Sequence, residues 1–134
     1  MIVLSALVFV FVLGGLAAAT ADLLVLENQS AMARDAAFLG AQAGGSQVDI
    51  GSAGSIDVPT TGTLTLDASA ATVCQQAVAH ADPGSTATCS VAAGTITVDV
   101  TQQVRLPLGL FGSTAVVRAH ARGGPAAGTV TASQ

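Results

Sequence analysis

The side chains that could do chemistry in this chain are few and scattered. His80 and His120 are its only histidines, and Cys74 and Cys89 are its only cysteines. A catalytic site needs titratable groups that converge, and this chain offers few. Metal ligands follow short, recurring spacings, and none of the usual ones occurs here. The arginines on either side of His120 also disfavour a cation there. The sequence therefore predicts no metal site and no bound cofactor.

Two aspartates, Asp49 and Asp57, stand in matching positions eight residues apart and could in principle hold a cation. They lack the pattern of a calcium loop, so we expect them to be solvent-facing strand residues. The chain also has no Gly-rich phosphate loop after a strand, no G-x-S-x-G and no H-E-x-x-H. These features predict that the protein is not an enzyme.

The two cysteines are better explained as a structural pair. An even cysteine count in a small exported domain is typical of a disulfide. A bridge that closes about 15 residues stabilises by roughly 3 kcal/mol in the chain-entropy model. The alternative is two unpaired buried thiols. We expect Cys74 on a short helix and Cys89 on the next strand to point into one core, which favours the bridge.

Composition limits the classes of partner. Of 134 residues, 51% are hydrophobic and only 9% charged, with a formal net charge of −4. Nucleic-acid binding needs a basic footprint, so we expect no nucleic-acid partner. Trp and Tyr are absent, which removes the usual stacking platforms for bases and sugars. The length leaves room for one small domain beyond an N-terminal helix.

The most informative stretch is residues 1–26, an apolar run in which Ser5, Thr20 and Asp22 are the only polar side chains. A helix of about 20 such residues spans a bilayer core of roughly 30 Å. Within lipid, a helix satisfies every backbone N–H and C=O of a single segment. The run is therefore a candidate membrane span.

Three interpretations of this run are open. A secretory signal peptide would explain the small residues Ala17, Ala19 and Ala21, but it needs Lys or Arg ahead of its apolar core. An ordinary anchor needs flanking basic residues as well, and the first one here is Arg34. We expect that a charged leader has been removed. We favour a subunit stored in the bilayer and later extracted, whose apolar helix is then buried against copies of itself.

The helix is predicted to continue to about residue 43, where Gly44 and Gly45 end it. About 43 residues make roughly 64 Å of helix, so its second half must leave the membrane and dock on a head. Gly14 and Gly15 can let another helix approach closely. Asp22 has two interpretations: it lies at the membrane surface, or it pairs with Arg34 of a neighbouring subunit.

The rest of the chain predicts a small head. Period-2 alternation separated by Gly, Ser, Thr and Pro indicates short antiparallel strands, and Asp67 or Ser69 can cap one short helix. We expect an α+β fold divided into a helix (1–43), a disulfide-linked head (44–122) and a tail (123–134) that a neighbouring subunit holds. The expected head elements are short strands within 46–67, a helix over 68–81, and strands over 86–92, 95–106 and 113–122.

Three stretches carry a resemblance to a known family. They are the apolar run continuing into ENQSAMARDAAFLGAQA, the cysteine-containing VCQQAVAHA and CSVAAGTITVDV, and the closing VRLPLGLFGSTAVVRAHAR. Together they resemble type IV pilin-like subunits, and most closely the TadE/TadG-like minor pilins of actinobacterial Tad (Flp) pilus systems. The segment 46–67 looks like an insertion. The resemblance implies a pilin-like fold, leader removal by a prepilin peptidase, and ATP-driven extrusion by a membrane machine.

One position departs from that family. Many pilins carry a glutamate where this chain has Ser5, and the glutamate is thought to pair with the N-terminal amine of a neighbour, here that of Met1. We expect a structural subunit of an extracellular helical filament, held in the cytoplasmic membrane before assembly, whose main partner is itself. The alternatives are a monomeric membrane-anchored envelope protein whose head binds a ligand or partner, and a secreted binding module.

Overall fold

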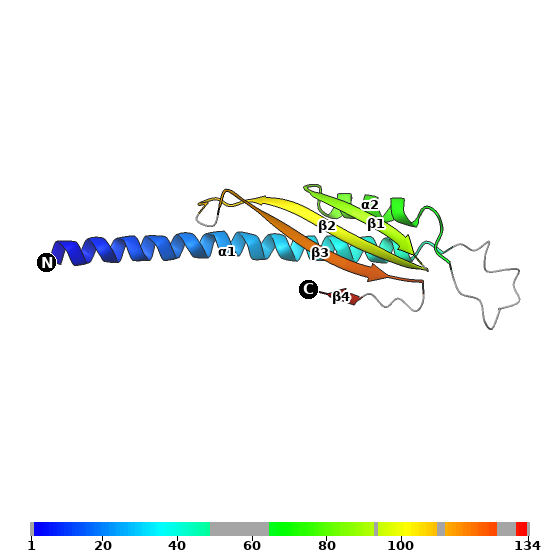
Figure 1. Cartoon of the computed structure of the whole chain (residues 1–134), viewed down its shortest axis with the longest axis horizontal. Helices are drawn as coiled ribbons and strands as arrows, with labels where there is room; N and C mark the ends of the chain where they lie inside the picture. Colours follow the sequence, from blue (N-terminus) through cyan, green and yellow to red (C-terminus); the bar gives the residue numbers. More distant parts are fainter. Residues whose placement is uncertain (1, 49–64, 93, 110–111, 126–130, 134) are drawn as a thin grey trace, which may run out of the picture.

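The computed structural model describes residues 2–48, 65–92, 94–109, 112–125 and 131–133. Its first element is one unbroken helix, α1 (Ile2–Gly45), of 44 residues. The segment holds no Pro, so nothing removes a backbone hydrogen bond along its length. Figure 1 shows α1 running the length of the molecule, with the head packed only on its C-terminal part. The long predicted helix is confirmed.

The head adds a second helix, α2 (Ala70–Ala81), and an antiparallel sheet in the order β1-β2-β3-β4. The α+β class predicted from the sequence is confirmed. Three of its strands correspond to predicted ones, to within one residue at each end. The strands are β1 (Ser85–Ala92), β2 (Thr95–Arg105), β3 (Thr114–Gly123) and β4 (Thr131–Ser133).

Alternation decides which face of the sheet is buried. In β2, Ile96, Val98 and Val100 are buried, whereas Asp99 and Thr101, the neighbours of Val100 on either side, are exposed. Successive strand residues point to opposite faces, so the register is fixed by this apolar set. The β1–β2 register brings Ala92 opposite Thr95, which leaves a two-residue connection. Its second residue, Gly94, has φ of 73°, a conformation that glycine adopts at little steric cost.

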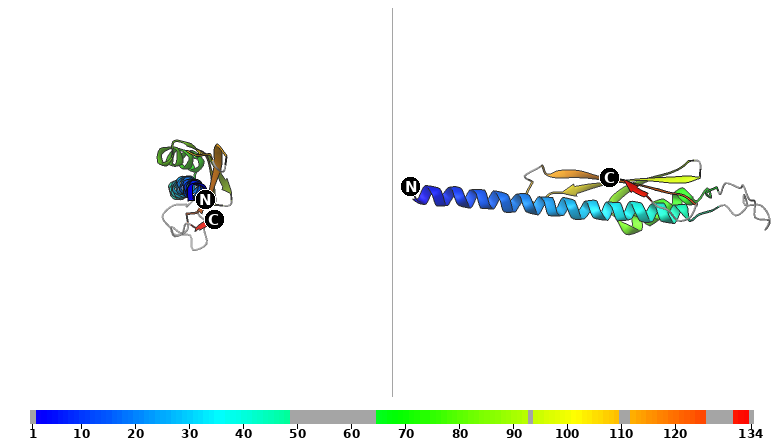
Figure 2. Two further views of the ribbon diagram at one scale, coloured as in Figure 1. Left: turned by 90° about the vertical axis from the view of Figure 1, so that its left-hand side faces the viewer. Right: turned by 90° about the horizontal axis from the view of Figure 1, so that it is seen from below.

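Both helices cover the same face of the sheet. Figure 2 shows α1 and α2 side by side with the strands to one side of them. α1 packs mainly on β2 and β3, α2 packs on β1, and the helices pack on each other. The core that results is made of small and branched side chains, among them Ala33, Ala37, Ala41, Val78 and Val98. The second half of α1 is therefore part of the head's core.

α1 ends at Gly45, the second residue of the predicted Gly44–Gly45 stop and two residues beyond the predicted end at about residue 43. Gly44 is buried. A Cβ at Gly44 would collide with Ile96 Cδ1 and lie 3.0 Å from the Ala70 carbonyl oxygen. Gly40 has a similar role, since its Cβ would lie 2.6 Å from Val78 Cγ2. Gly40 and Gly44 thus also permit the close approach of α1 to α2 and the sheet.

α2 begins just after a local turn. Ser69 is its N-cap residue, and the Ser69 N–H donates to Asp67 Oδ1 over 2.7 Å. The side-chain and backbone hydrogen bonds from Ser69 hold the pKa of the Asp67 carboxyl below its usual value. Cys74 is buried, as predicted, and so is Val78 one turn later, whereas Ala81 at the helix end is exposed.

The Cys74–Cys89 disulfide is present. It joins α2 to β1 across 15 residues of sequence, with the two Cα atoms 6.3 Å apart. The predicted bridge between helix and sheet is thus confirmed.

Two predicted regions differ or remain open. The strands expected within 46–67 fall largely on residues outside the described ones, including Asp49 and Asp57, although Val48 and Leu66 form an antiparallel bridge. The tail was expected to have no structure of its own and to be held by a neighbour. Instead, its residues Thr131–Ser133 form β4, which pairs with β3 of the same chain.

Candidate functional site

The first half of α1 is bare on every side. All residues from 3 to 17 are exposed, and the apolar ones include Val3 at 80%, Phe11 at 73% and Leu16 at 63%. We call residues 3–17 the apolar rod. Soluble monomers rarely expose contiguous apolar patches of more than a few hundred Å². The rod therefore needs either lipid or other protein around it.

The length of the helix that precedes the head matches a bilayer. Residues 3–21 precede the first buried side chain of the helix, Asp22, and residues 18, 19 and 21 among them are half-buried. At 1.5 Å per residue these 19 residues measure about 28 Å, close to the roughly 30 Å of a hydrocarbon core. Within the described residues, α1 is the one helix long and apolar enough to cross a membrane. Membrane anchoring through this helix is compatible with the structure.

Asp22 marks the junction between the bare segment and the head. Its side chain has no exposed surface, and its Oδ1 accepts a hydrogen bond of 3.1 Å from the backbone N–H of Leu108. Leu108 belongs to the loop between β2 and β3, which reaches back along α1 toward the rod (Figure 1). The carboxylate thus binds a loop of its own chain, an arrangement that neither of the two sequence-based interpretations anticipated.

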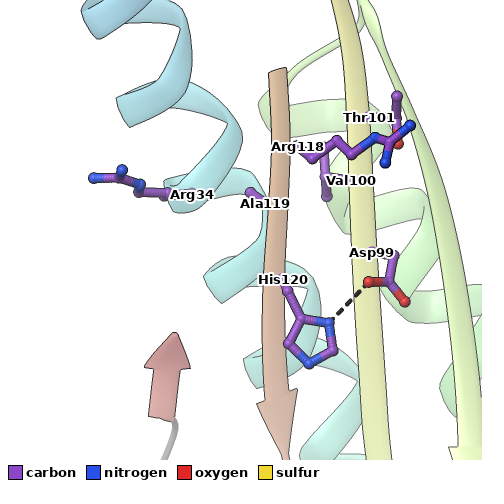
Figure 3. Close-up of a pocket in the computed structure, with 7 residues that line it drawn as sticks. All are labelled: Arg34, Asp99, Val100, Thr101, Arg118, Ala119 and His120. Atoms are coloured by element: carbon purple, nitrogen blue, oxygen red, sulfur yellow. Dashed lines mark hydrogen bonds and ion pairs between the residues drawn. The ribbon is translucent and has the colours of Figure 1, made fainter. Parts of the chain in front are cut away.

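Arg34, the expected partner of Asp22 between subunits, lies elsewhere on the helix. The two residues are twelve positions apart, or about 18 Å of helical rise. Figure 3 shows the Arg34 side chain pointing away from the strands, on the flank of α1. Because Asp22 is fully buried within its own chain, a neighbour's Arg34 would have to displace the loop to reach it. That intersubunit pair remains a prediction.

The other predicted rod residues are not brought together within one chain. Ser5 is exposed on the rod. A Cβ added to Gly14 or Gly15 would meet nothing within 4 Å, so both glycines present open backbone. Met1 lies outside the described residues. Only a second copy or the membrane could give these positions a role.

A groove of about 310 Å³ lies beside Arg34 on the head. Its other lining residues come from the middle of β2 and β3 (Figure 3). Within it, His120 Nδ1 and Asp99 Oδ1 are 2.8 Å apart, and both side chains are partly exposed. The residues lining the groove are Arg34, Asp99, Val100, Thr101, Arg118, Ala119 and His120.

The described part of the chain contains no group of three or more His, Cys, Asp or Glu side chains placed to hold a metal ion. His80 is exposed near the end of α2, and Cys74 is taken up by the disulfide.

The main residue that sequence reasoning missed is Leu108. The available signals were an acidic side chain inside the apolar run and an apolar hairpin loop, residues 107–112. Nothing in their spacing indicates that they touch, because 86 residues separate Asp22 from Leu108. Only the packing of the hairpin along α1 brings them together.

Comparison with known proteins finds no matching family model, no matching curated protein and no matching solved structure. The functional argument therefore depends on the geometry of this chain.

Proposed function

We propose that this chain is the structural subunit of an extracellular helical filament, similar to the pilins of type IV and Tad-like pili. The observation that carries the proposal is the division of α1 into a bare apolar rod and a second half covered by the head. A rod that is apolar all round suits lipid before assembly. It equally suits a bundle of identical rods afterwards.

The composition of the rod supports packing between copies. Association of helices in an apolar setting depends on van der Waals contact and favours small residues that let backbones approach. Gly14 and Gly15 supply such a point, with open space around both positions. The head, with its own core and disulfide, is then displayed outward from the bundle.

The location and partners follow from this proposal. Before assembly the rod lies in the cytoplasmic membrane, and afterwards the filament extends from the cell surface. The main partner is a further copy of the chain. A prepilin peptidase and an assembly machine are partners that the sequence resemblance implies.

A second candidate is a monomeric membrane-anchored envelope protein whose head binds a ligand or partner. The match between the bare segment and the bilayer thickness serves that function equally well. The two proposals differ in whether rods ever contact each other.

Substitution in the rod separates the two. A Ser5→Lys variant places a charge in the bundle, so we expect cells producing it to lose surface fibres. Thr88→Lys, at an exposed position on β1, is the matched control and should keep normal fibres. Disulfide formation in both variants verifies that the head folds. Normal fibre yield from the Ser5→Lys variant would refute packing through the rod.

A further inference from the structure

Where the rod enters the head, exposed leucines lie on both the helix and the loop. Leu23 and Leu24 on α1 are 55% and 66% exposed, and Leu108 on the β2–β3 loop is 55% exposed. We call these three residues the apolar collar. They lie at one level of the molecule because the hydrogen bond from Leu108 to Asp22 holds the loop against the helix there.

The loop is held from two directions. Leu106 is 7% exposed, so the loop's first residue packs into the head. Two residues later, the Leu108 N–H binds the Asp22 carboxylate. Asp22 itself has no exposed surface, so it presents no charge to its surroundings at the level of the collar. A charge facing lipid would be costly, and the burial of Asp22 avoids that cost.

The surface changes character just beyond the collar. On the helix, exposed Glu27 follows Leu24 by three residues, or about 4.5 Å of rise. On β2, exposed Arg105 precedes Leu108 by three residues, or about 10 Å of extended chain. An apolar surface that gives way to both signs of charge within about 10 Å matches the polarity profile of a bilayer interface.

We propose that the apolar collar is a second membrane contact of the stored subunit: Leu108 inserts at the boundary between lipid headgroups and acyl chains. This inference rests on the proposed storage of the rod in the membrane. The occupant of the collar is the lipid bilayer surface, because the collar continues the apolar span at about 28 Å from its start. Asp22 acts as a positioning residue that sets the depth of the loop.

The consequence is a fixed orientation of the head. A span alone leaves α1, together with the head packed on it, free to tilt relative to the membrane normal. A second contact on one side of the helix holds the long axis of the sheet close to the membrane normal. Extraction of the subunit must then release the collar as well as the rod.

The chain has no Trp and no Tyr, so a single introduced Trp is a clean reporter. The full chain with Leu108→Trp is placed in phosphatidylcholine vesicles that contain a lipid spin-labelled at a shallow acyl position. We expect blue-shifted emission and several-fold quenching. The matched control is Val91→Trp: Val91 is 41% exposed and lies at the opposite end of the sheet, opposite Ile96, about 30 Å away. It should emit as in water and resist quenching.

A third reporter separates failure of the collar from failure of membrane storage. Leu13→Trp lies on the rod and should be quenched by a lipid labelled deep in the acyl chain. If the Leu13 reporter is quenched and the Leu108 reporter behaves like the Val91 reporter, the collar is refuted while storage stands. If the Leu13 reporter is not quenched, both proposals fail.

The role of Asp22 is tested in the Leu108→Trp background. Asp22→Ala removes the acceptor, so we expect the shallow quenching to fall at least two-fold and the emission to shift to the red. Asp22→Asn keeps a side-chain oxygen and should preserve most of the quenching. Unchanged quenching with Asp22→Ala would overturn the positioning role. Intact disulfide and helix content in each variant show that the head remains folded.

Discussion

The backbone N–H of Leu108 lies 3.1 Å from Oδ1 of Asp22, which joins the β2–β3 loop to α1 across 86 residues of sequence. This bond occurs at the point where the bare segment of the helix meets the head. The bond therefore fixes where along α1 the head begins, and so how long the apolar segment before the head is.

Loss of the Asp22 carboxylate should free the loop. In an Asp22→Ala variant, the amide of Leu108 should exchange with solvent at least ten-fold faster, since a hydrogen bond to a charged group contributes about 1.5–3 kcal/mol. Hydrogen-exchange NMR of the full chain in micelles measures this rate. The amide of Val98, in the centre of the sheet, is the internal control. Equal protection of Leu108 in both proteins would contradict the contact.

The last residue of β3 should not tolerate a side chain. A Cβ at Gly123 would lie 2.5 Å from the backbone carbonyl oxygen of Ala41, and a helix backbone cannot move aside cheaply. We expect Gly123→Ala to lower the free energy of unfolding by about 1–3 kcal/mol.

Gly84→Ala is the control for that variant, because its Cβ would meet atoms only at 3.6 Å. Denaturant unfolding of both proteins compares them directly. Equal free energies of unfolding for the two variants would show that β3 does not pack closely against α1 at Gly123.

Removal of the disulfide should destabilise the head without changing its topology. Replacing both Cys74 and Cys89 with Ser should lower the free energy of unfolding by about 3 kcal/mol, given the 15-residue separation. Intact mass before and after reduction should differ by two hydrogens. An unchanged mass, or equal melting temperatures with and without reductant, would contradict the bridge.

The Asp67 carboxyl should titrate below its usual pKa of 3.8, because Ser69 donates to it through its side chain and backbone. A depressed folded-state pKa stabilises the fold above the unfolded pKa, and this contribution is lost as pH falls through the folded value. Ser69→Ala should raise the pKa of Asp67, as followed by carboxyl NMR. An unchanged pKa would show that the Ser69 side chain does not bind it.

The long helix, the strands and the disulfide could be predicted because each depends on a local pattern. An apolar run without Pro gives α1, and strict alternation around Ile96, Val98 and Val100 gives β2 with its buried face. Cys74 and Cys89 were placed on adjacent elements by the same periodicities, which is sufficient to bring them together.

The features that could not be predicted share one physical cause. They depend on tertiary contacts, which produce only a weak pattern in the sequence. Gly44 is predictable as part of the helix end, but its close packing against Ile96 is not. The segment Thr131–Ser133 of the tail is too short for the sequence to predict a strand, yet it pairs with the edge of β3. No sequence feature links Asp22 to Leu108, because Leu108 contributes only its backbone N–H to the hydrogen bond.

The most direct test of the central proposal is electron cryomicroscopy of fibres sheared from cells that produce this chain. The proposal predicts helical fibres in which residues 3–17 of many copies form the core and the disulfide-linked heads form the outer surface. Recovery of the chain solely as a detergent-dependent monomer in the membrane fraction would contradict it.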